Sequence, residues 1–453
     1  MGSALSVSRN SRYPKLLHGR GMPRLRVEGS CALPGKDRNL ELPVAMTRGR
    51  SPRHLIRTVD MTLNRKLRYG MVGGGPGAFI GAVHRRAAEL DGLAELVAGA
   101  FSSNPEKSRA QGIALHLDPA RSYASYEEMA AREAERPLGD RIDVVVIVTP
   151  NHVHYAAAVA FLERGFHVIC DKPMTTTLTD AESLCRLVEK RGVVFALTHN
   201  YSGYPMVKEA RALVASGALG EVRKVVVEYS QGWLSTLLEE SGQKQADWRT
   251  DPARAGAGVL GDIGSHAEHL ARYVTGLEIE RLAADVATVV PGRRIDDDAN
   301  LLLKFEGGAR GVLHCSQIAV GEENRISIRV YGSRASLEWL QEEPNVLIVR
   351  HADGPMQLLR PGHGYLSAAA QQATRVPSGH PEAFFEAFGN LYGNALRTIA
   401  ARVMGADPAP ADLDFPTVQD GARGVHFIQT ALKSGREGSA WVDARYTPPG
   451  AAR

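Results

Sequence analysis

The sequence of 453 residues predicts an α/β fold in two domains. The first domain is a parallel sheet covered by helices, and the second is an α+β domain with a large, mostly antiparallel open sheet. Short apolar runs alternate with helical patterns up to about residue 197, as in successive βαβ units. After residue 200 strand-like runs follow one another, which is typical of an antiparallel sheet. We therefore expect domains at residues 61–197 and 198–453.

The strands of the first domain are expected from short apolar runs. Residues 144–148 are all Val or Ile, which suits a strand that is buried on both faces of a parallel sheet. Strands are predicted at residues 67–72, 93–101, 142–149, 167–170 and 193–197, and helices at 78–90, 154–164 and 179–191.

The second domain is expected to be richer in strands. These are predicted at residues 222–229, 284–290, 300–305, 311–318, 326–330 and 335–339, with a hairpin turn at 306–308. Flanking helices are expected at residues 206–216, 264–274, 381–403 and 418–434. Residues 351–379 are expected to form a long irregular loop, and loops of that length are usually functional or mobile.

Composition and charge exclude several classes of protein. The chain is 44% hydrophobic and 23% charged, as in ordinary globular proteins, and has no apolar run long enough to span a membrane. Residues 1–60 hold 12 Lys/Arg and 4 Asp/Glu, so the remainder has a net charge of −4 and no basic stripe for nucleic acid. The four cysteines are far apart, which predicts no disulfide framework and favours the cytoplasm.

Residues 1–60 show neither helical nor strand periodicity and are rich in Arg, Ser, Gly and Pro. We interpret them as a disordered leader, or as a start assigned too early, with Met61 as the true first residue. An organelle transit peptide and an N-myristoylation signal at Gly2 remain alternatives.

A glycine-rich turn joins the first strand to the first helix, and its residues are Gly73, Gly74, Gly75, Pro76, Gly77 and Ala78. Read as G-x-G-x-x-A, the turn needs Gly73 for its tight bend and Gly75 for a close backbone approach to a pyrophosphate. Ala78 would let helix and strand pack closely. Pro76 removes one N–H donor but suits a first helical position. This context predicts a dinucleotide site in a Rossmann domain.

The end of the second strand bears on the choice between NAD and NADP. Residues 101–104 read FSSN, without the carboxylate that NAD enzymes commonly place there. Ser102 and Ser103 can hydrogen-bond a 2′-phosphate, and Lys107 or Arg109 can supply positive charge. The sequence therefore favours NADP and leaves NAD open.

Two further clusters fall where chemistry is expected. Lys172 directly follows the strand at 167–170, at the sheet edge where open α/β sheets bind ligands. Asp262 and His266 are four residues apart, on one face of an expected helix start. Taken singly, a solvated lysine and a capping Asp/His pair are the more common explanations.

Together and in this order, the three signals resemble the Gfo/Idh/MocA family of nicotinamide-dependent sugar and polyol oxidoreductases, over roughly residues 65–445. Lys172 lies in an Asp-Lys-Pro sequence that is similar to the family's Glu-Lys-Pro, and Asp262 and His266 match its D-x-x-x-H. A third element resembles T-P-N-x-x-H, whose Asn lies near the nicotinamide ribose; its residues here are Thr149, Pro150, Asn151 and His154.

Two more segments carry the resemblance. His199, Asn200 and Tyr201, followed by Pro205, resemble the segment that enters the second domain, although the Arg commonly found there is missing. Residues 415–421 look like the start of the family's last helix.

The resemblance implies oxidation of a secondary alcohol, with the roles reversed for reduction. A histidine that titrates near neutrality suits the base, which is His266. Asp262 would orient the hydroxyl or favour the imidazolium, and Lys172 would stabilise negative charge on the substrate oxygen. The resemblance also implies a cis bond between Lys172 and Pro173.

The implied substrate is a sugar, an inositol or a related cyclic polyol. Aromatic faces can stack on sugar rings and polar groups can bind hydroxyls, which suggests as contacts Asn200, Tyr201, Trp233, Trp248, Arg249 and His380. Trp233 and Trp248 can equally be packing residues, and His380 can cap a helix. A sugar acid would require a cation such as Arg249 or Arg254.

Two other functions remain open on the same fold. One is a glycosidase-like enzyme that oxidises transiently and keeps its NAD bound, and the other is a non-catalytic NAD(P)-sensing regulator. The histidines do not cluster at metal-ligand spacing, so no metal site is predicted. The family implies a homodimer or homotetramer, with a small molecule as the other partner and no membrane or nucleic acid.

Overall fold

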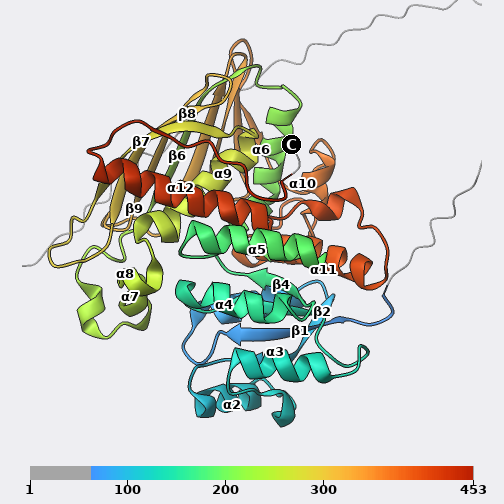
Figure 1. Cartoon of the computed structure of the whole chain (residues 1–453). Helices are drawn as coiled ribbons and strands as arrows, with labels where there is room; N and C mark the ends of the chain where they lie inside the picture. The colour runs from blue at the N-terminus through green and yellow to red at the C-terminus, as the bar shows by residue number, and fades with distance from the viewer. Residues whose placement is uncertain (1–62, 452–453) are drawn as a thin grey trace, which may run out of the picture. The chain divides into compact units, whose positions relative to one another are not determined.

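The structure is a computed structural model that describes residues 63–451. The expected leader at residues 1–60 and the alternative start at Met61 lie outside these residues. Within them, a parallel sheet is followed along the chain by a larger, mostly antiparallel one (Figure 1). No helix among residues 63–451 is both long and apolar enough to cross a lipid bilayer.

The first sheet has five parallel strands in the order β2-β1-β3-β4-β5. Its central strand has all five residues buried, as its Val and Ile content predicts. The strands are β1 Leu67–Gly73, β2 Ala94–Ala100, β3 Val144–Val148, β4 His167–Cys170 and β5 Phe195–Leu197. Because all five are parallel, their C-terminal ends lie along one edge, which carries both the glycine-rich turn and Lys172.

The helices that follow these strands are α1 Phe79–Glu89, α2 Pro105–Ala114, α3 Tyr126–Glu135, α4 Asn151–Leu162 and α5 Leu178–Arg191. Helices α2 and α3 are absent from the sequence-based prediction. Helix α2 buries only Ser108 and Gly112, so it has no apolar stripe to reveal it. Both are started by side-chain caps, since Asn104 accepts from the Lys107 N–H and Ser125 from the Glu128 N–H.

The second sheet has nine strands in the order β13-β12-β11-β10-β6-β9-β8-β7-β14. Only the β6–β9 pair is parallel. The strands are β6 Val222–Ser230, β7 Ile279–Ala287, β8 Asp298–Phe305, β9 Arg310–Ser316, β10 Arg325–Gly332, β11 Ala335–Leu340, β12 Leu347–His351, β13 Gln357–Leu359 and β14 Val442–Asp443. The predicted turn at residues 306–308 joins β8 to β9, with the Gly308 N–H donating to the Phe305 carbonyl.

Two predictions for this region are wrong. The strand predicted at residues 284–290 lies at 279–287 instead. Its N-terminal half contains alanines and charged residues, so its apolar pattern is weak, and its pairing with β8 makes it a strand. Residues 351–379 are not irregular throughout, since they contain β13 and a short helix at Ala368–Gln372. Strand β13 is held by its pairing with β12, which the local sequence does not reveal.

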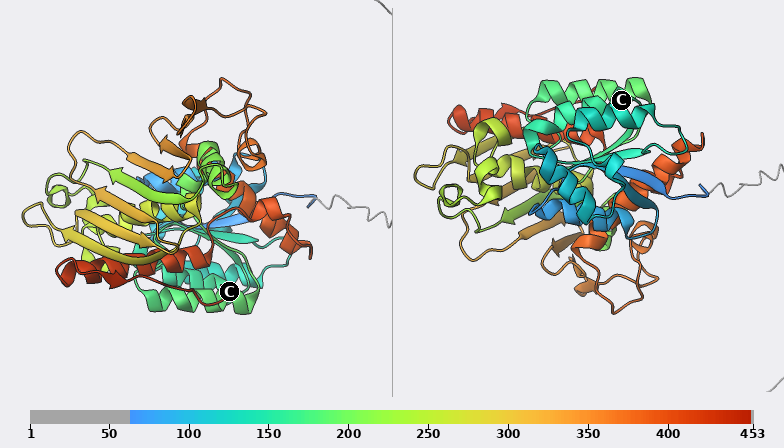
Figure 2. Two further views of the ribbon diagram at one scale, coloured as in Figure 1. Left: turned by 90° about the horizontal axis from the view of Figure 1, so that it is seen from above. Right: turned by 90° about the horizontal axis from the view of Figure 1, so that it is seen from below.

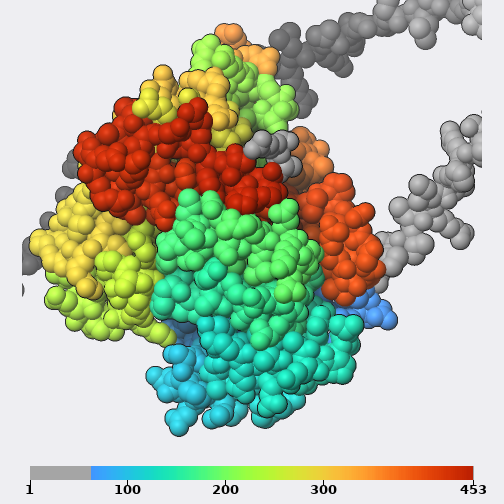
Figure 3. Space-filling view, in the orientation of Figure 1, coloured from blue at the N-terminus to red at the C-terminus, as the bar shows by residue number. Residues whose placement is uncertain are grey.

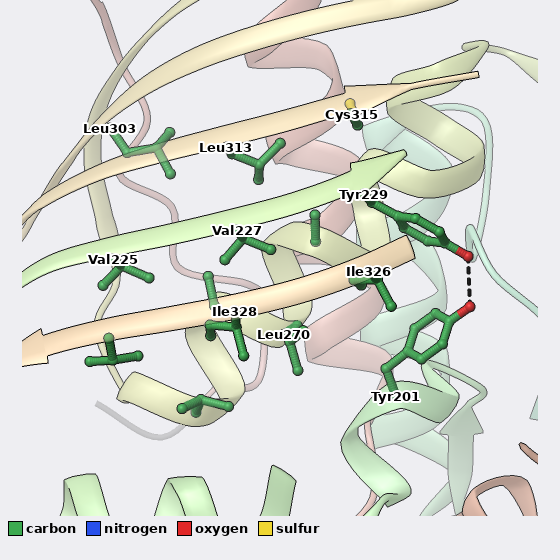
Figure 4. Packing of buried hydrophobic residues seen from close by; sticks show 14 of the residues in the cluster. Tyr201, Val225, Val227, Tyr229, Leu270, Leu303, Leu313, Cys315, Ile326 and Ile328 are labelled. Atoms are coloured by element: carbon green, nitrogen blue, oxygen red, sulfur yellow. Dashed lines mark hydrogen bonds between the residues drawn. The ribbon is translucent and has the colours of Figure 1, made fainter. Parts of the chain in front are cut away.

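The helices of this second half are α6 Pro205–Ala215, α7 Lys244–Arg249, α8 Pro252–Ala255, α9 Ser265–Thr275, α10 Ala368–Gln372, α11 Phe384–Val403 and α12 Val418–Arg436. Helix α9 packs on β6, α6 packs on α9, and α12 packs on β7, so these helices cover one face of the large sheet (Figures 1 and 2). Figure 4 shows apolar side chains of that face, among them Val227 and Ile328, packed toward Leu270 of α9.

Helices α11 and α12 join the two sheets. Helix α11 packs on α1 and contributes Phe388 and Tyr392 to the core of the first sheet. Helix α12 lies beside α5, and its residues form a continuous surface next to it (Figures 1 and 3). Its first half places Val425 in the core of the first sheet, and its second half places Ile428 in that of the large sheet.

Candidate active site

The glycine-rich turn between β1 and α1 has no room for side chains at two positions. A Cβ atom at Gly73 would lie 2.7 Å from the Val148 carbonyl oxygen, and the residue has a φ of +86°. A Cβ atom at Gly75 would lie 2.6 Å from the Phe101 carbonyl oxygen. Glycine at these two positions therefore lets the turn pack closely against the ends of β2 and β3. No side chain of Gly73 or Gly75 covers the backbone of the turn.

A close approach between helix and turn occurs at Gly81, and the packing role expected of Ala78 stays a prediction. A Cβ atom at Gly81 would lie 2.4 Å from the Gly74 Cα atom. Ala78 is half-buried and precedes α1, which begins at Phe79. The helix therefore meets the turn three residues later than the G-x-G-x-x-A spacing suggests.

The residues after β2 are mainly exposed. The Ser102 hydroxyl accepts a hydrogen bond from the Asn104 N–H at 3.1 Å. Ser103, Lys107 and Arg109 are exposed. None of these side chains is used to hold a neighbouring element, so all remain available to a ligand.

The element at residues 149–154 binds neighbouring turns together. Asn151 is buried and donates from Nδ2 to the Ala255 carbonyl at 3.0 Å. His154 is buried, and its ring nitrogens lie 2.9 Å from the carbonyls of Pro173 and Thr149. Its ring nitrogens therefore hold these turns together, and a contact of His154 with a cofactor stays a prediction. The Thr149 hydroxyl, in contrast, is buried without a partner among the described residues.

Lys172 and Asp262 meet across the two halves of the chain. The Lys172 Nζ atom lies 2.9 Å from Asp262 Oδ1 and also donates to the Asp262 carbonyl. Asp262 accepts a second hydrogen bond from Gln317 and lies 3.4 Å from the Arg249 Nε atom. Burial opposes its ionisation, but Lys172 and Arg249 hold the pKa of Asp262 well below its ordinary value. The expected cis bond between Lys172 and Pro173 is confirmed.

The sequence predicts that Asp262 and His266 lie on one face of a regular helix, but the structure differs. Residues Leu260–Gly264 form a π-helical turn, and α9 begins at Ser265. The carboxylate of Asp262 is engaged by Lys172 and Gln317, whereas the ring of His266 contacts His199, with 3.4 Å between their Nδ1 atoms. Asp262 is therefore placed to hold Lys172 rather than to stabilise a protonated His266.

The surroundings of His266 favour its neutral form. Burial, followed by Lys172, His199 and His269, lowers its pKa well below the ordinary histidine value. The expectation that it titrates near neutrality is therefore wrong for the protein without ligand. A neutral imidazole has a lone pair, so His266 is able to accept a proton.

A cavity of about 610 Å³ collects these groups. It is bounded by the edge of the first sheet, the start of α9 and one end of the large sheet. Its polar lining residues are Asp171, Lys172, Thr198, Asn200, Tyr201, Tyr229, Gln231, Trp233, Gln243, Gln245, Arg249, Asp262, His266, Asn324 and Gln341. Two carboxylates and two cations are among them, so the charges in the cavity balance.

Most sequence-predicted contacts are brought together here, namely Asn200, Tyr201, Trp233 and Arg249. Trp248 is not part of the lining. Trp248 and Arg249 are successive residues of helix α7, so their side chains leave the helix in different directions. The Trp248 ring lies beside the Arg249 guanidinium, whose carbon is 4.3 Å from the ring centroid. Arg254 pairs with Asp247 outside the cavity, and His380 contacts the Pro377 carbonyl.

A hydrogen-bonded network that sequence reasoning missed forms one wall. The hydroxyls of Tyr201 and Tyr229 are 2.6 Å apart (Figure 4), and Tyr229 donates to Asn324 at 2.8 Å. Gln231 also donates to Asn324, and the Trp233 indole donates to Gln231. These residues come from η2 (Asn200–Gly203), β6 and the loops at the end of the sheet, so no local pattern links them.

Two family models match the chain. Residues 67–199 match the oxidoreductase family with an NAD-binding Rossmann fold of the GFO/IDH/MocA group. Residues 207–338 match the GFO/IDH/MocA C-terminal domain.

Individual proteins match over most of the chain. An oxidoreductase of Bacillus subtilis (strain 168), described as uncharacterized, is 34% identical over 388 residues, which are 85% of this chain and 98% of the relative. The crystal structure of an oxidoreductase from Sinorhizobium meliloti is 47% identical, with a TM-score of 0.76 and coverage of 84% and 100%. An inositol dehydrogenase homolog from Azotobacter vinelandii, complexed with NADH and myo-inositol, is 37% identical, with a TM-score of 0.78 and coverage of 84% and 98%.

Proposed function

Because this chain belongs to the Gfo/Idh/MocA family of NAD-binding oxidoreductases, we propose that it interconverts a secondary alcohol and a ketone on an uncharged cyclic polyol or sugar. The observation that carries the proposal is the convergence of Lys172, Asp262 and His266 on one cavity. A proton acceptor, a cation and a carboxylate that holds the cation are what alcohol oxidation requires of the protein.

The turn between β1 and α1 is where the chain would hold a dinucleotide. Gly73, Gly75, Pro76 and Gly77 would face the phosphates with their backbone, next to the N-terminus of α1. One feature fits such a group: the Thr149 hydroxyl is buried without a hydrogen-bond partner among residues 63–451. When bound, the nicotinamide supplies the hydride acceptor or donor.

The three catalytic side chains have separate tasks in this proposal. Neutral His266 accepts the hydroxyl proton during oxidation and returns it during reduction. The Lys172 ammonium stabilises the negative charge that develops on the substrate oxygen. Asp262 restrains Lys172 through the 2.9 Å ion pair and so fixes the direction of its charge.

The lining of the cavity favours an uncharged polyol over a sugar acid. Amide and hydroxyl groups predominate, and the charge of Arg249 is offset by Asp262. A substrate carboxylate would add an uncompensated negative charge to a cavity whose charges already balance. The complex of the Azotobacter vinelandii homolog with myo-inositol supports the same class. Asn200, whose Nδ2 is buried without a partner among the described residues, would donate to a substrate hydroxyl.

For the cofactor we propose NAD or NADP, with NADP slightly favoured. The support is local: the segment after β2 presents Ser102 and Ser103, with Lys107 and Arg109 nearby in the sequence, and residues 101–104 contain no carboxylate.

We propose in addition that the chain forms a homo-oligomer through the uncovered face of the large sheet. Leu302 of β8 and Tyr331 of β10 are exposed on this face. The residues next to them in their strands include buried ones, which point to the opposite, covered face. Sedimentation of the purified protein, compared with a Leu302→Glu variant, tests this. A wild type that sediments as a monomer contradicts it.

The function is tested with purified full-length protein, NAD or NADP, and a panel of inositols, neutral hexoses and sugar acids. Reduced nicotinamide is followed by its near-ultraviolet absorbance, and His266→Ala is assayed beside the wild type. We expect turnover with an uncharged polyol that is lost in the variant. Turnover with sugar acids alone would contradict the substrate class, and unchanged turnover by the variant would contradict the assignment of the base.

A further inference from the structure

A group of three histidines lies in the core behind the cavity. His199 follows β5, and His266 and His269 lie on α9. Their exposed fractions are only 2%, 6% and 3%. Imidazole is costly to bury without hydrogen bonds, so a cluster of three calls for an explanation other than packing.

Within this cluster only one pair is connected by ring nitrogens. The Nδ1 atoms of His199 and His266 are 3.4 Å apart, and their rings are nearly perpendicular. The ring of His269 instead stacks on His199, with centroids 4.5 Å apart and an interplanar angle of 9°, a geometry that allows no hydrogen bond between the rings.

A hydrogen bond between two neutral imidazoles needs one protonated and one unprotonated nitrogen. If His266 carries its proton on Nδ1, it donates to His199 and leaves Nε2 unprotonated. His266 lines the cavity, and Nε2 is its one ring nitrogen that His199 does not occupy. In this arrangement the contact with His199 is made by the tautomer of His266 that a base requires.

We propose that His199 is the partner base of His266: it holds His266 in the Nδ1-protonated tautomer and accepts that proton when His266 deprotonates the substrate. This inference rests on the proposed alcohol oxidation. In that direction the substrate O–H bond breaks as an N–H bond forms at His266 Nε2. The His266 Nδ1–H bond then breaks as an N–H bond forms at His199 Nδ1. His266 ends neutral in its other tautomer, the positive charge resides on His199, and the two electrons leave with the hydride.

Burial opposes a positive charge on both rings, and one carboxylate distinguishes His199 from His266. Lys172 and the histidines His199 and His269 oppose a positive charge on His266, and the rings of Tyr201 and Tyr229 beside it carry no charge. Burial, together with His269, Lys172 and Arg272, holds the pKa of His199 well below the ordinary histidine value, and the carboxylate of Asp420 on α12 acts in the opposite direction. Transfer to His199 therefore moves the charge toward the Asp420 carboxylate.

Asp262 is not available for the same task. Although it is four residues from His266, its carboxylate is bound by Lys172 and Gln317 and lies beside Arg249. The expected Asp/His partnership is thus replaced by a His/His partnership that the sequence spacing does not indicate.

Three variants of the full-length chain separate the two tasks of His199. His199→Asn keeps an acceptor for the His266 Nδ1–H but cannot take up a proton. His199→Phe removes both properties. His269→Phe is the matched control, because it replaces a neighbouring buried histidine with an aromatic ring that can still stack on His199.

The tautomer of His266 is measured first, by ¹⁵N NMR of histidine-labelled protein without substrate. We expect Nδ1 to be protonated in the wild type, in His199→Asn and in His269→Phe, and this preference to be lost in His199→Phe. A wild-type His266 protonated at Nε2 would overturn the proposal. Because no substrate is present, this result is independent of whether a polyol is oxidised.

Kinetics then test the transfer. We expect kcat of His199→Asn to fall roughly 10²-fold with KM within about twofold, since general acid–base steps contribute about 10²–10⁴-fold. The solvent deuterium isotope effect on kcat should change in that variant, and His269→Phe should match the wild type. Wild-type kcat in His199→Asn would overturn the proposal. Absence of any polyol oxidation by the wild type would instead count against the proposed function.

Discussion

The Lys172 ammonium lies 2.9 Å from the Asp262 carboxylate, and this ion pair joins the C-terminal end of β4 to the turn that precedes α9. The two residues are 90 positions apart in the sequence. Their contact brings the C-terminal edge of the parallel sheet and the turn at Leu260–Gly264 into one site. The chemistry proposed for the chain depends on this junction, and the first prediction tests it.

Replacement of Lys172 by methionine should remove the charge while keeping most of the side-chain volume. We expect kcat to fall by about 10²–10³-fold, as when one electrostatic group of an active site is removed. Initial-rate kinetics with the best polyol substrate measure the effect. Lys190→Met is the control, since Lys190 is exposed on α5, and equal losses in both variants would contradict a specific role of Lys172.

The pH dependence of oxidation should reflect the lowered pKa of His266. A base with a lowered pKa stays unprotonated, and therefore active, to a lower pH than usual. We expect kcat/KM to be independent of pH from neutrality down past 6.5, the ordinary histidine value, and to fall only in more acidic solution. Stopped assays across that range test this, and an acidic limb centred at or above 6.5 would contradict it.

Gly81 should be intolerant of even one methyl group. In Gly81→Ala the new Cβ atom would lie 2.4 Å from the Gly74 Cα atom, so backbone must move. We expect a loss of about 1–3 kcal/mol in the free energy of unfolding, as for overpacked sites, together with weaker dinucleotide binding. Urea unfolding and cofactor titration measure the two effects.

The control for this prediction is Gly139→Ala. Gly139 is exposed and nothing lies within 4 Å of its added Cβ atom. Its free energy of unfolding should change by no more than about 0.5 kcal/mol. A Gly81→Ala variant as stable as this control would show that the turn and α1 can separate without cost.

Cofactor preference should respond to a carboxylate placed after β2. Ser102→Asp introduces a negative charge where the sequence lacks one, which repels a 2′-phosphate and offers an acceptor to a 2′-hydroxyl. We expect the ratio of kcat/KM for NADP to that for NAD to fall about tenfold or more, equivalent to roughly 1.4 kcal/mol. Ser102→Asn controls for side-chain size, and an unchanged ratio in Ser102→Asp would contradict the proposed position of the ribose.

Local patterns in the sequence predicted most of the scaffold, and the order of three such patterns along the chain pointed to the three catalytic candidates. The bend at Gly73 and the buried run of β3 each follow from a few neighbouring residues, because backbone freedom and burial are local requirements. Lys172 and His266 could be found because each lies in a short motif. Helix α2 escaped because its capping residues, rather than an apolar stripe, start it.

The tertiary structure alone decided which partners these residues have. His199 and His266 are 67 positions apart, and Tyr201 and Asn324 are 123 apart, so their contacts depend on sheet register and helix packing. The same packing turned Asp262 toward Lys172 and lowered the pKa of His266. Local sequence determines which side chains a turn or strand can carry, whereas charge state and hydrogen bonding are set by the neighbours that folding brings from distant parts of the chain.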